Sequence, residues 1–300
     1  WVTGGVFVVA VSCWYLWRGR NVQFAKRSIF VGGFVGLLGT VAVMLSGDVS
    51  GVQAAEYQPM KLAAMEGLED GGRRAPFSIV PGVEIPGMLS ILATHDLNGY
   101  VPGINDIING YTDNEGNIVP SVAEKMEMGR TALEALAQYR TLKDTDPVAA
   151  AAAREVLEAN VQYMGYGYLE SPEDVIPPVG MVYWAFRFMV GFGMLIALVL
   201  VLTLWFNYKG KLPQMKWLLL AAMACIPFVY VCEESGWIVA EVGRQPWTIQ
   251  GLLPVNVAIS DTSVAEVMTT FFVFLGVFAL FLVIEIRIMI NAIKKGPSVD

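Results

Sequence analysis

Five long runs of apolar residues constrain what this chain of 300 residues can fold into. Crossing the hydrocarbon core of a membrane, about 30 Å thick, takes roughly 20 apolar residues in a helix. Only 16% of the residues are charged, against about 25% in ordinary soluble domains. The sequence therefore predicts an all-α integral membrane bundle with five transmembrane helices. The runs are Trp1 to Trp17, which is short, Ser28 to Ser46, Gly180 to Phe206, Trp217 to Ala240 and Val264 to Ile290.

Charged residues are distributed unevenly between these runs. The hydrophilic stretch 47–178 carries 20 Asp and Glu but only 8 Lys and Arg. Lys and Arg mark cytoplasmic loops, so the basic segments after the first, third and fifth runs, and with them the C-terminus, are predicted to be cytoplasmic. These segments contain Arg18, Arg20, Lys26 and Arg27, then Lys209, Lys211 and Lys216, then Arg287, Lys294 and Lys295. The predicted organisation is two transmembrane helices in 1–46, a large extracytoplasmic loop in 47–178 and three transmembrane helices in 179–300.

The large loop contains both helical and irregular patterns. Ser121 to Tyr139 and Pro147 to Tyr163 are rich in Ala and Glu at helical spacing, which predicts two surface helices. Gly and Pro punctuate Gly71 to Pro120, which predicts irregular structure there. From physical chemistry alone, the stretch from Gln58 to Gly67 is typical of an interfacial helix whose Lys61 and Glu66 are solvated.

Several site classes are excluded or disfavoured. Cys13, Cys225 and Cys232 all fall in apolar runs without a metal or redox spacing, so disulfides are not expected. His95 is the only histidine, so this chain alone cannot supply a haem with two histidine ligands. There is no nucleotide-binding fingerprint, and we expect no nucleic-acid partner. The chain begins at Trp1 without a methionine, which we interpret as truncation at the N-terminus.

Ionisable residues inside apolar spans are functional candidates because they are costly there. Glu234 and Glu241 are seven residues apart on the fourth span, and Trp237 lies within one turn of both, so one helix face carries two carboxylates and an indole. Arg244 can reach back to a carboxylate or to a haem propionate. An ion pair that only caps this helix explains Glu241 and Arg244 equally well, and spacing does not decide between the two interpretations.

Met189 and Arg187 are the corresponding candidates on the third span. A methionine in an apolar helix is usually part of the packing, but thioether sulfur is also a known haem ligand. Arg187 is two residues away, about 200° around the helix, so only its long side chain could approach a haem bound at Met189.

Four strings, in this order along the chain, resemble subunit I of the cytochrome bd quinol oxidases. They are Gln58-Pro-Met-Lys-Leu-Ala-Ala-Met-Glu66, Phe186-Arg-Phe-Met189, Glu234-Ser-Gly-Trp-Ile-Val-Ala-Glu241 and Gly243-Arg-Gln-Pro-Trp247. The resemblance implies that Met189 is a ligand of the low-spin b haem and Glu241 a ligand of the high-spin b haem. It implies that Lys61 and Glu66 act in quinol binding and oxidation. The remaining residues of these motifs would form the haem environment, namely Arg187, Glu234, Trp237, Arg244, Gln245 and Trp247.

The resemblance also implies an enzyme in a bacterial or archaeal cytoplasmic membrane. Such an enzyme passes electrons from quinol through two b haems to haem d, reduces oxygen to water and generates a proton gradient without pumping. The family subunit has nine spans, of which this chain resembles the fifth to ninth. The histidine partner of Met189 and most residues for haem d are therefore expected upstream of Trp1. Expected partners are subunit II, a small single-span subunit, quinol, oxygen and membrane lipid.

Two alternatives remain from other functional classes. One is a haem-free membrane scaffold or assembly partner, which a haem difference spectrum would distinguish from the oxidase. The other is a proton-coupled transporter that uses the carboxylates within the spans. The sequence shows neither paired broken helices nor a repeat that relates two halves, which disfavours the transporter.

Overall fold

The computed structural model describes residues 1–296 and divides into two compact units, Trp1–Ala258 and a second that begins at Ile259. The α-helices of the first unit are α1 (Val2–Trp17), α2 (Val22–Tyr57), α3 (Pro59–Glu66), α4 (Met88–Thr94), α5 (Ile104–Asn109), α6 (Val122–Leu142), α7 (Pro147–Asn160), α8 (Val179–Tyr208) and α9 (Lys216–Glu241). Short 3-10 helices are η1 (Val161–Tyr168), η2 (Pro172–Val175) and η3 (Leu212–Gln214). The strands are β1 (Gly72–Arg73), β2 (Phe77–Val80), β3 (Val83–Ile85), β4 (Tyr100–Val101), β5 (Tyr111–Thr112), β6 (Ile118–Val119), β7 (Trp247–Ile249) and β8 (Leu253–Pro254).

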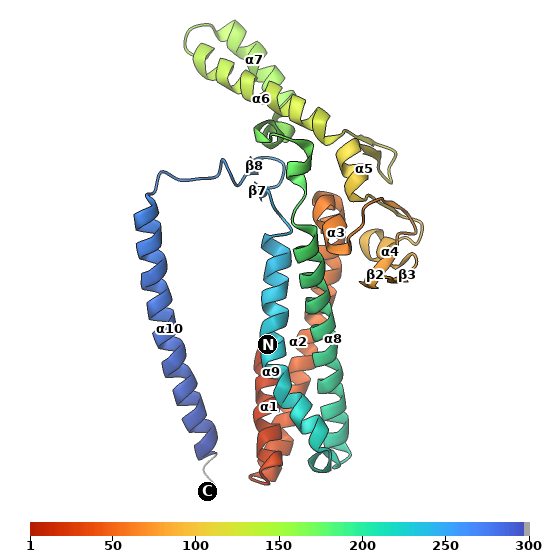
Figure 1. Cartoon of the computed structure of the whole chain (residues 1–300), viewed down its shortest axis with the longest axis vertical. Coiled ribbons are helices and arrows are strands. Elements are labelled where there is room, and N and C mark those ends of the chain that lie inside the picture. Colours follow the sequence, from red (N-terminus) through yellow and green to blue (C-terminus); the bar gives the residue numbers. More distant parts are fainter. Residues whose placement is uncertain (297–300) are drawn as a thin grey trace. The chain divides into compact units, whose positions relative to one another are not determined.

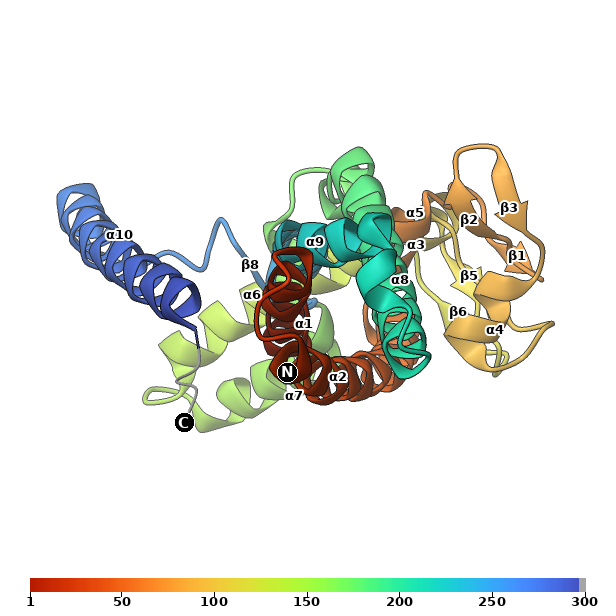
Figure 2. The same cartoon turned by 90° about the horizontal axis from the view of Figure 1, so that it is seen from below.

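Four long helices of the first unit form a bundle. Helix α1 packs against α2 and α9, and α8 packs against α2 and α9, so the four helices make a closed ring of contacts. Figure 2 shows this ring along the helix axes. Helices α6 and α7 lie beyond one end of the bundle, and α3 lies beside α8 at that same end (Figure 1).

Glycines on two sides of α2 allow its neighbours to approach closely. A Cβ on Gly5 of α1 would lie 2.6 Å from the backbone of Gly36 and 2.7 Å from the carbonyl oxygen of Gly32. On another side of α2, a Cβ on Gly33 would lie 2.7 Å from Leu204 of α8. Lipid tails are as apolar as leucine, so helices in a membrane associate through such close van der Waals packing.

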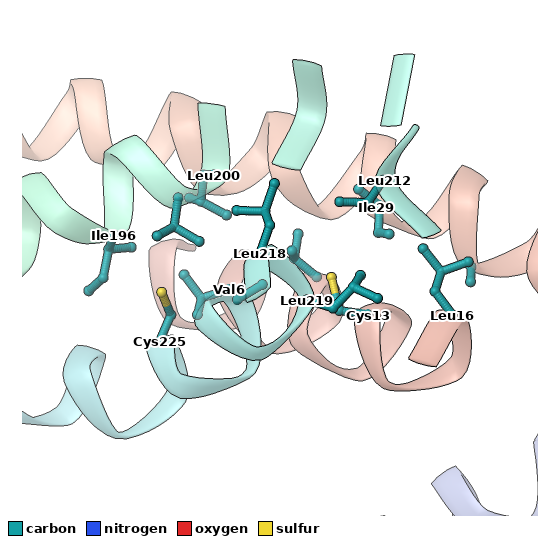
Figure 3. Close-up of a cluster of buried hydrophobic side chains, with 14 of the residues drawn as sticks. Val6, Cys13, Leu16, Ile29, Ile196, Leu200, Leu212, Leu218, Leu219 and Cys225 are labelled. Atoms are coloured by element: carbon teal, nitrogen blue, oxygen red, sulfur yellow. The ribbon is translucent and has the colours of Figure 1, made fainter. Parts of the chain in front are cut away.

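Buried apolar side chains fill the bundle at the end where α1 and α8 terminate. Figure 3 shows Val6, Leu200 and Leu218 pointing toward one another from α1, α8 and α9. Cys13 and Cys225 belong to this cluster, and within residues 1–296 all three cysteines are free, as the sequence predicted.

Four helical segments of the described chain are long and apolar enough to cross a membrane. They are α2, the segment Pro172–Tyr208 that contains α8, α9, and α10 (Val264–Lys295) of the second unit. The first predicted span corresponds to the 16-residue helix α1, which is shorter than these. Helix α2 has 36 residues and continues to Tyr57, so the predicted end of this span at Ser46 lies inside a helix.

The loop between α2 and α8 is more regular than its glycine and proline content predicts. Helices α6 and α7 match the two predicted surface helices. The stretch Gly71 to Pro120 was expected to be irregular, but it holds antiparallel pairs β1–β4, β2–β3 and β5–β6 and the short helices α4 and α5. The expectation was wrong because these strands are only two to four residues long, too short to give an alternating pattern, and because β1 pairs with the distant β4.

Helix α10 is the main element of the second unit. Its N-terminus carries a capping box in which Ser263 and Glu266 exchange hydrogen bonds, and Lys294 and Lys295 lie in its last turn. Both features stabilise helix ends. None of its residues is buried within the described chain, although it is the most apolar of the candidate spans.

The glycine packing predicts a large difference between two adjacent residues of α1. Gly5→Val places side-chain atoms against the backbone of α2, so we expect the free energy of unfolding to fall by about 3 kcal/mol. Gly4→Val is the matched control, because a Cβ at Gly4 meets no described atom within 4 Å. Thermal melting of the purified full-length subunit in its complex measures both variants. Equal losses at the two positions would contradict this account of the α1–α2 contact.

Candidate functional site

Helix α3 lies against the loop-side end of α8 and against the chain just beyond α9. Lys61, near its start, lies against the chain just beyond α9, since a Cβ on Gly243 would lie 3.2 Å from the Lys61 Cγ. Val182 of α8 is 3.4 Å from the same position. Glu66, the last residue of α3, faces α8 instead. The two quinol-site candidates therefore face different neighbours, Lys61 the segment after α9 and Glu66 helix α8.

Glu66 forms a buried ion pair with Arg187 of α8. The Arg187 Nη2 donates to the Glu66 Oε2 at 2.8 Å, and the two side chains are only 7% and 2% exposed. The prediction of a solvated Glu66 on an interfacial helix was therefore wrong for this residue. It failed because the partner lies 121 residues further along the chain.

Arg187 also binds backbone groups from two separate loop segments. Its Nη1 donates to the Met65 carbonyl oxygen at 2.6 Å, and its Nη2 donates to the Ser78 carbonyl oxygen at 2.5 Å. The guanidinium lies 4.1 Å from the ring centre of Tyr183, whose hydroxyl is 2.8 Å from the Ser78 hydroxyl. Arg187 thus fastens both α3 and the β2–β3 hairpin to α8.

Burial and neighbouring charges shift the pKa values of both candidates on α3. Burial raises the pKa of the Glu66 carboxyl, while the charge and hydrogen bond of Arg187 and a bond from the Ser78 backbone act in the opposite direction. Burial and then the charge of Arg244 lower the pKa of Lys61, and Glu241 partly opposes them. In both groups the charged form is less favoured than it is in water.

Two residues of α9 surround Met189. The Cys232 thiol donates to the Met189 carbonyl oxygen at 3.2 Å, and a Cβ on Gly236 would lie 3.1 Å from the Met189 Sδ. One turn further along α8, Phe192 stacks on Phe228 with ring centres 4.8 Å apart. The α8–α9 contact therefore fixes the Met189 backbone, and α9 presents a residue without a side chain to the thioether.

The end of α9 carries the second group of predicted site residues. Arg244 Nη2 donates to Glu241 Oε2 at 2.5 Å, so the ion pair that spacing allowed does form. The Gln245 amide donates to the Glu241 carbonyl oxygen at 3.3 Å. Glu234 and Trp237 are exposed on α9 within the described chain.

Trp247 differs from the other motif residues because it is enclosed by the loop. It is 3% exposed and packs in a cluster with Met60 of α3, and its ring centre lies 4.8 Å from that of Tyr166. In this chain it joins the loop to the segment after α9.

Sequence reasoning did not find several contacts of this site. Cys232 and Gly236 share one face of α9, but nothing in the sequence aligns that face with Met189. Ser78 lies in a stretch predicted to be irregular and gave no signal. The hydroxyl of Thr3 donates to Glu233 Oε1 at 2.6 Å, which gives one of the carboxylates on the span a partner from α1. Residues 1–296 contain no cluster of three or more His, Cys, Asp or Glu that could hold a metal ion.

Comparisons with known proteins agree on one family. The sequence model described as "Cytochrome bd terminal oxidase subunit I" matches residues 1–297. The chain is 32% identical to the cytochrome bd-II ubiquinol oxidase subunit 1 of Escherichia coli and 29% identical to the cytochrome bd ubiquinol oxidase subunit 1 of Bacillus subtilis. These matches cover 99% of this chain but 60% and 55% of the two relatives.

A solved structure shares the fold. The bd oxidase from Geobacillus thermodenitrificans matches with a TM-score of 0.67 at 23% identity, over 99% of this chain and 56% of that one. The chain thus spans little more than half the length of the proteins that it resembles.

Loss of the Arg187 side chain should release the loop from α8. Arg187→Leu leaves the Glu66 carboxylate buried without its partner, which destabilises by about 3–5 kcal/mol. We expect faster tryptic cleavage at Arg73 and Arg74, beside the β2–β3 hairpin, in the full-length subunit. Replacing both partners, as Arg187→Leu with Glu66→Leu, should restore much of the protection. The exposed pair of Arg130 and Glu127 supplies the control, since Arg130→Leu should change nothing.

The stability of the Arg187→Leu variant should depend on pH. With Arg187 replaced, burial is opposed only by the bond from the Ser78 backbone, so the pKa of the Glu66 carboxyl in the folded state lies further above the unfolded value. A group of this kind stabilises the fold at low pH and loses that contribution as pH rises through its folded pKa. The excess of tryptic cleavage in Arg187→Leu over the Arg130→Leu control should therefore shrink as the medium is acidified. A defect that is unchanged or larger in acid would argue against a buried carboxylate as its cause.

Proposed function

The chain belongs to the cytochrome bd terminal oxidase subunit I family, and on that premise we propose that it oxidises quinol and binds b haem within a membrane terminal oxidase. The complete enzyme would pass electrons from quinol through a low-spin and a high-spin b haem to haem d and reduce oxygen to water. Most residues for haem d would come from parts of the subunit outside this chain.

One observation carries this proposal. Arg187 binds Glu66, the candidate for quinol deprotonation, and lies two residues from Met189, the candidate haem ligand. Oxidation of quinol requires a proton acceptor and an electron acceptor at one place. A direct contact between the two candidate regions supports that combination.

The residues present suit a haem. Met189 offers a thioether sulfur next to Gly236, which has no side chain to cover it. The Nε atoms of Arg187 and Arg244 are buried and have no hydrogen-bond partner among the described residues, and such N–H groups suit carboxylates like haem propionates. Glu241 is 41% exposed and can keep its bond to Arg244 with one oxygen while offering the other to iron. When bound, the haems supply one-electron transfer at potentials set by these ligands.

Lys61 and Glu66 would handle the quinol itself. A lysine with a lowered pKa remains a hydrogen-bond donor to a quinol oxygen. Glu66 has a raised pKa, which favours proton uptake, and the opposing charge of Arg187 favours subsequent release. A carboxylate balanced in this way can relay a proton from quinol to water at the membrane surface.

The setting of the oxidase is part of the same proposal. We place the large loop outside the cytoplasmic membrane and the basic helix ends inside it, following the distribution of Lys and Arg. Protons released outside and consumed from inside would produce a gradient without pumping. Subunit II, a small single-span subunit, quinol, oxygen and lipid would be the partners. The haem-free scaffold remains the alternative for this part of the subunit taken alone.

Separate substitutions of the two proposed haem ligands should each remove a different haem from the full-length complex. Met189→Leu keeps the side-chain volume but offers iron no lone pair, so the low-spin b spectrum should be lost while high-spin b remains. Glu241→Ala should instead deplete high-spin b, together with haem d, and leave low-spin b. Reduced-minus-oxidised difference spectra measure both, and each variant is the control for the other. Full low-spin haem in Met189→Leu would rule out that ligand, and an unchanged haem complement in Glu241→Ala would reduce Glu241 to a helix cap.

Changes at the proposed quinol site should separate activity from haem content. Glu66→Gln keeps the shape but cannot accept a quinol proton, and Lys61→Met removes the donor. We expect each to lower quinol oxidation by roughly 100-fold, as for loss of a general base. All haem bands should remain, and so should oxygen reduction with an artificial electron donor. Normal quinol oxidation, or haem loss along with activity, would contradict the assignment.

A further inference from the structure

An apolar groove lies between α2 and α8 on the outer face of the bundle. It has a volume of about 260 Å³ and is lined by Phe30, Leu37, Val201, Leu204, Trp205 and Tyr208. Its floor exists because Gly33 has no side chain, which lets Leu204 of α8 pack onto the α2 backbone. Both helices are candidate membrane spans, so the groove lies along a part of the bundle that is predicted to be in the membrane.

The face of α2 that lines this groove also carries the positively charged Lys26. Lys26, Phe30, Gly33 and Leu37 recur at intervals of four, three and four residues, so they share one face of the helix. The Asn207 amide of α8 donates to the Lys26 carbonyl oxygen at 2.9 Å, which sets Lys26 level with the last turn of α8. Lys26 therefore lies at the end of the groove.

Helix α8 brings a second positive charge to the same end. The Lys209 ammonium lies 5.1 Å from the ring centre of Trp205, a residue that lines the groove. Tyr208, the last residue of α8, lines it as well and is 76% exposed. Aromatic residues of this kind are typical of the membrane–water interface, which places the mouth of the groove at headgroup depth.

No acidic residue balances these lysines along the helices that form the bundle. Asp and Glu are absent from residues 1–47 and from residues 179–232, which include α1, most of α2, all of α8 and the first two thirds of α9. The groove thus combines an apolar wall with a positively charged mouth that no acidic residue within 1–47 or 179–232 compensates.

We propose that this groove binds an anionic phospholipid, with one acyl chain along Phe30, Leu204 and Trp205 and the headgroup phosphate between Lys26 and Lys209. Basic pockets between transmembrane helices on the cytoplasmic side are suited to anionic headgroups. A volume of about 260 Å³ can take part of an acyl chain but not the body of a further helix, which is about 10 Å in diameter. This inference depends on the chain spanning a membrane and not on its oxidase activity.

The test uses the complete complex in phosphatidylcholine vesicles that contain phosphatidylglycerol with a photoactivatable acyl chain. Crosslinks are mapped by peptide mass spectrometry, and we expect them on residues 30–37 and 201–208. Lys26→Gln combined with Lys209→Gln should reduce crosslinking there about tenfold, since each basic residue contributes to binding of anionic lipid. Val201→Phe should fill the groove and remove the crosslinks without a change of charge.

The opposite seam of the bundle provides a matched control. Arg18 and Lys216 lie over Trp14 and Trp17 where α1 ends and α9 begins, so Arg18→Gln with Lys216→Gln removes the same charge from the same side of the membrane. Crosslinking in the α2–α8 groove should be unchanged in this variant. The proposal would be overturned if the control lost crosslinks to the same extent. It would also be overturned by equal labelling with a phosphatidylcholine probe, or by crosslinks to another polypeptide in place of lipid.

Discussion

The buried contact between Arg187 and Glu66 organises the loop-side end of the bundle. Taking two charges out of water carries a penalty of several kcal/mol for each ion, and their attraction offsets it only when the remaining donors are also satisfied. Here the carbonyl oxygens of Met65 and Ser78 and the ring of Tyr183 complete the surroundings of the guanidinium. A lysine has no planar fork with which to contact all of these groups at once. This single side chain thus contacts both α3 and the β2–β3 hairpin from α8.

The two ends of helix α3 lie against different parts of the bundle. Glu66 binds Arg187 of α8, which is two residues from Met189, and Lys61 lies against Gly243 beside Arg244. A quinol bound along α3 would therefore lie between the two groups of proposed haem residues. In the same pairing, burial and Arg187 act on the pKa of Glu66 in opposite directions, and burial is the larger effect.

Most of the helical framework could be predicted from the sequence because the property that determines it is local. A run of about 20 apolar residues in a membrane can satisfy its backbone only as a helix, and α2, α8, α9 and α10 all follow from that rule. Helices α6 and α7 follow from their Ala- and Glu-rich spacing. The pairing of β1 with β4 was missed because no local pattern joins Gly72 to Val101. The hairpins β2–β3 and β5–β6 pair neighbouring segments, but their strands are only two to four residues long, too short for an alternating pattern to stand out among the glycines and prolines.

For the candidate site, the sequence by itself determined only which residues are proposed to carry the chemistry. Its motifs single out Met189, Glu241, Lys61 and Glu66, and their spacing correctly allows a bond between Glu241 and Arg244. Only the tertiary structure decided their surroundings: that Glu66 is buried on Arg187, that Gly236 faces the Met189 sulfur, and that Gly33 opens a groove beside two lysines. The reason is physical. Hydropathy and helical phase are properties of neighbours in the chain, whereas burial and ion pairing depend on which helix faces come together, and that is fixed only when the whole bundle packs.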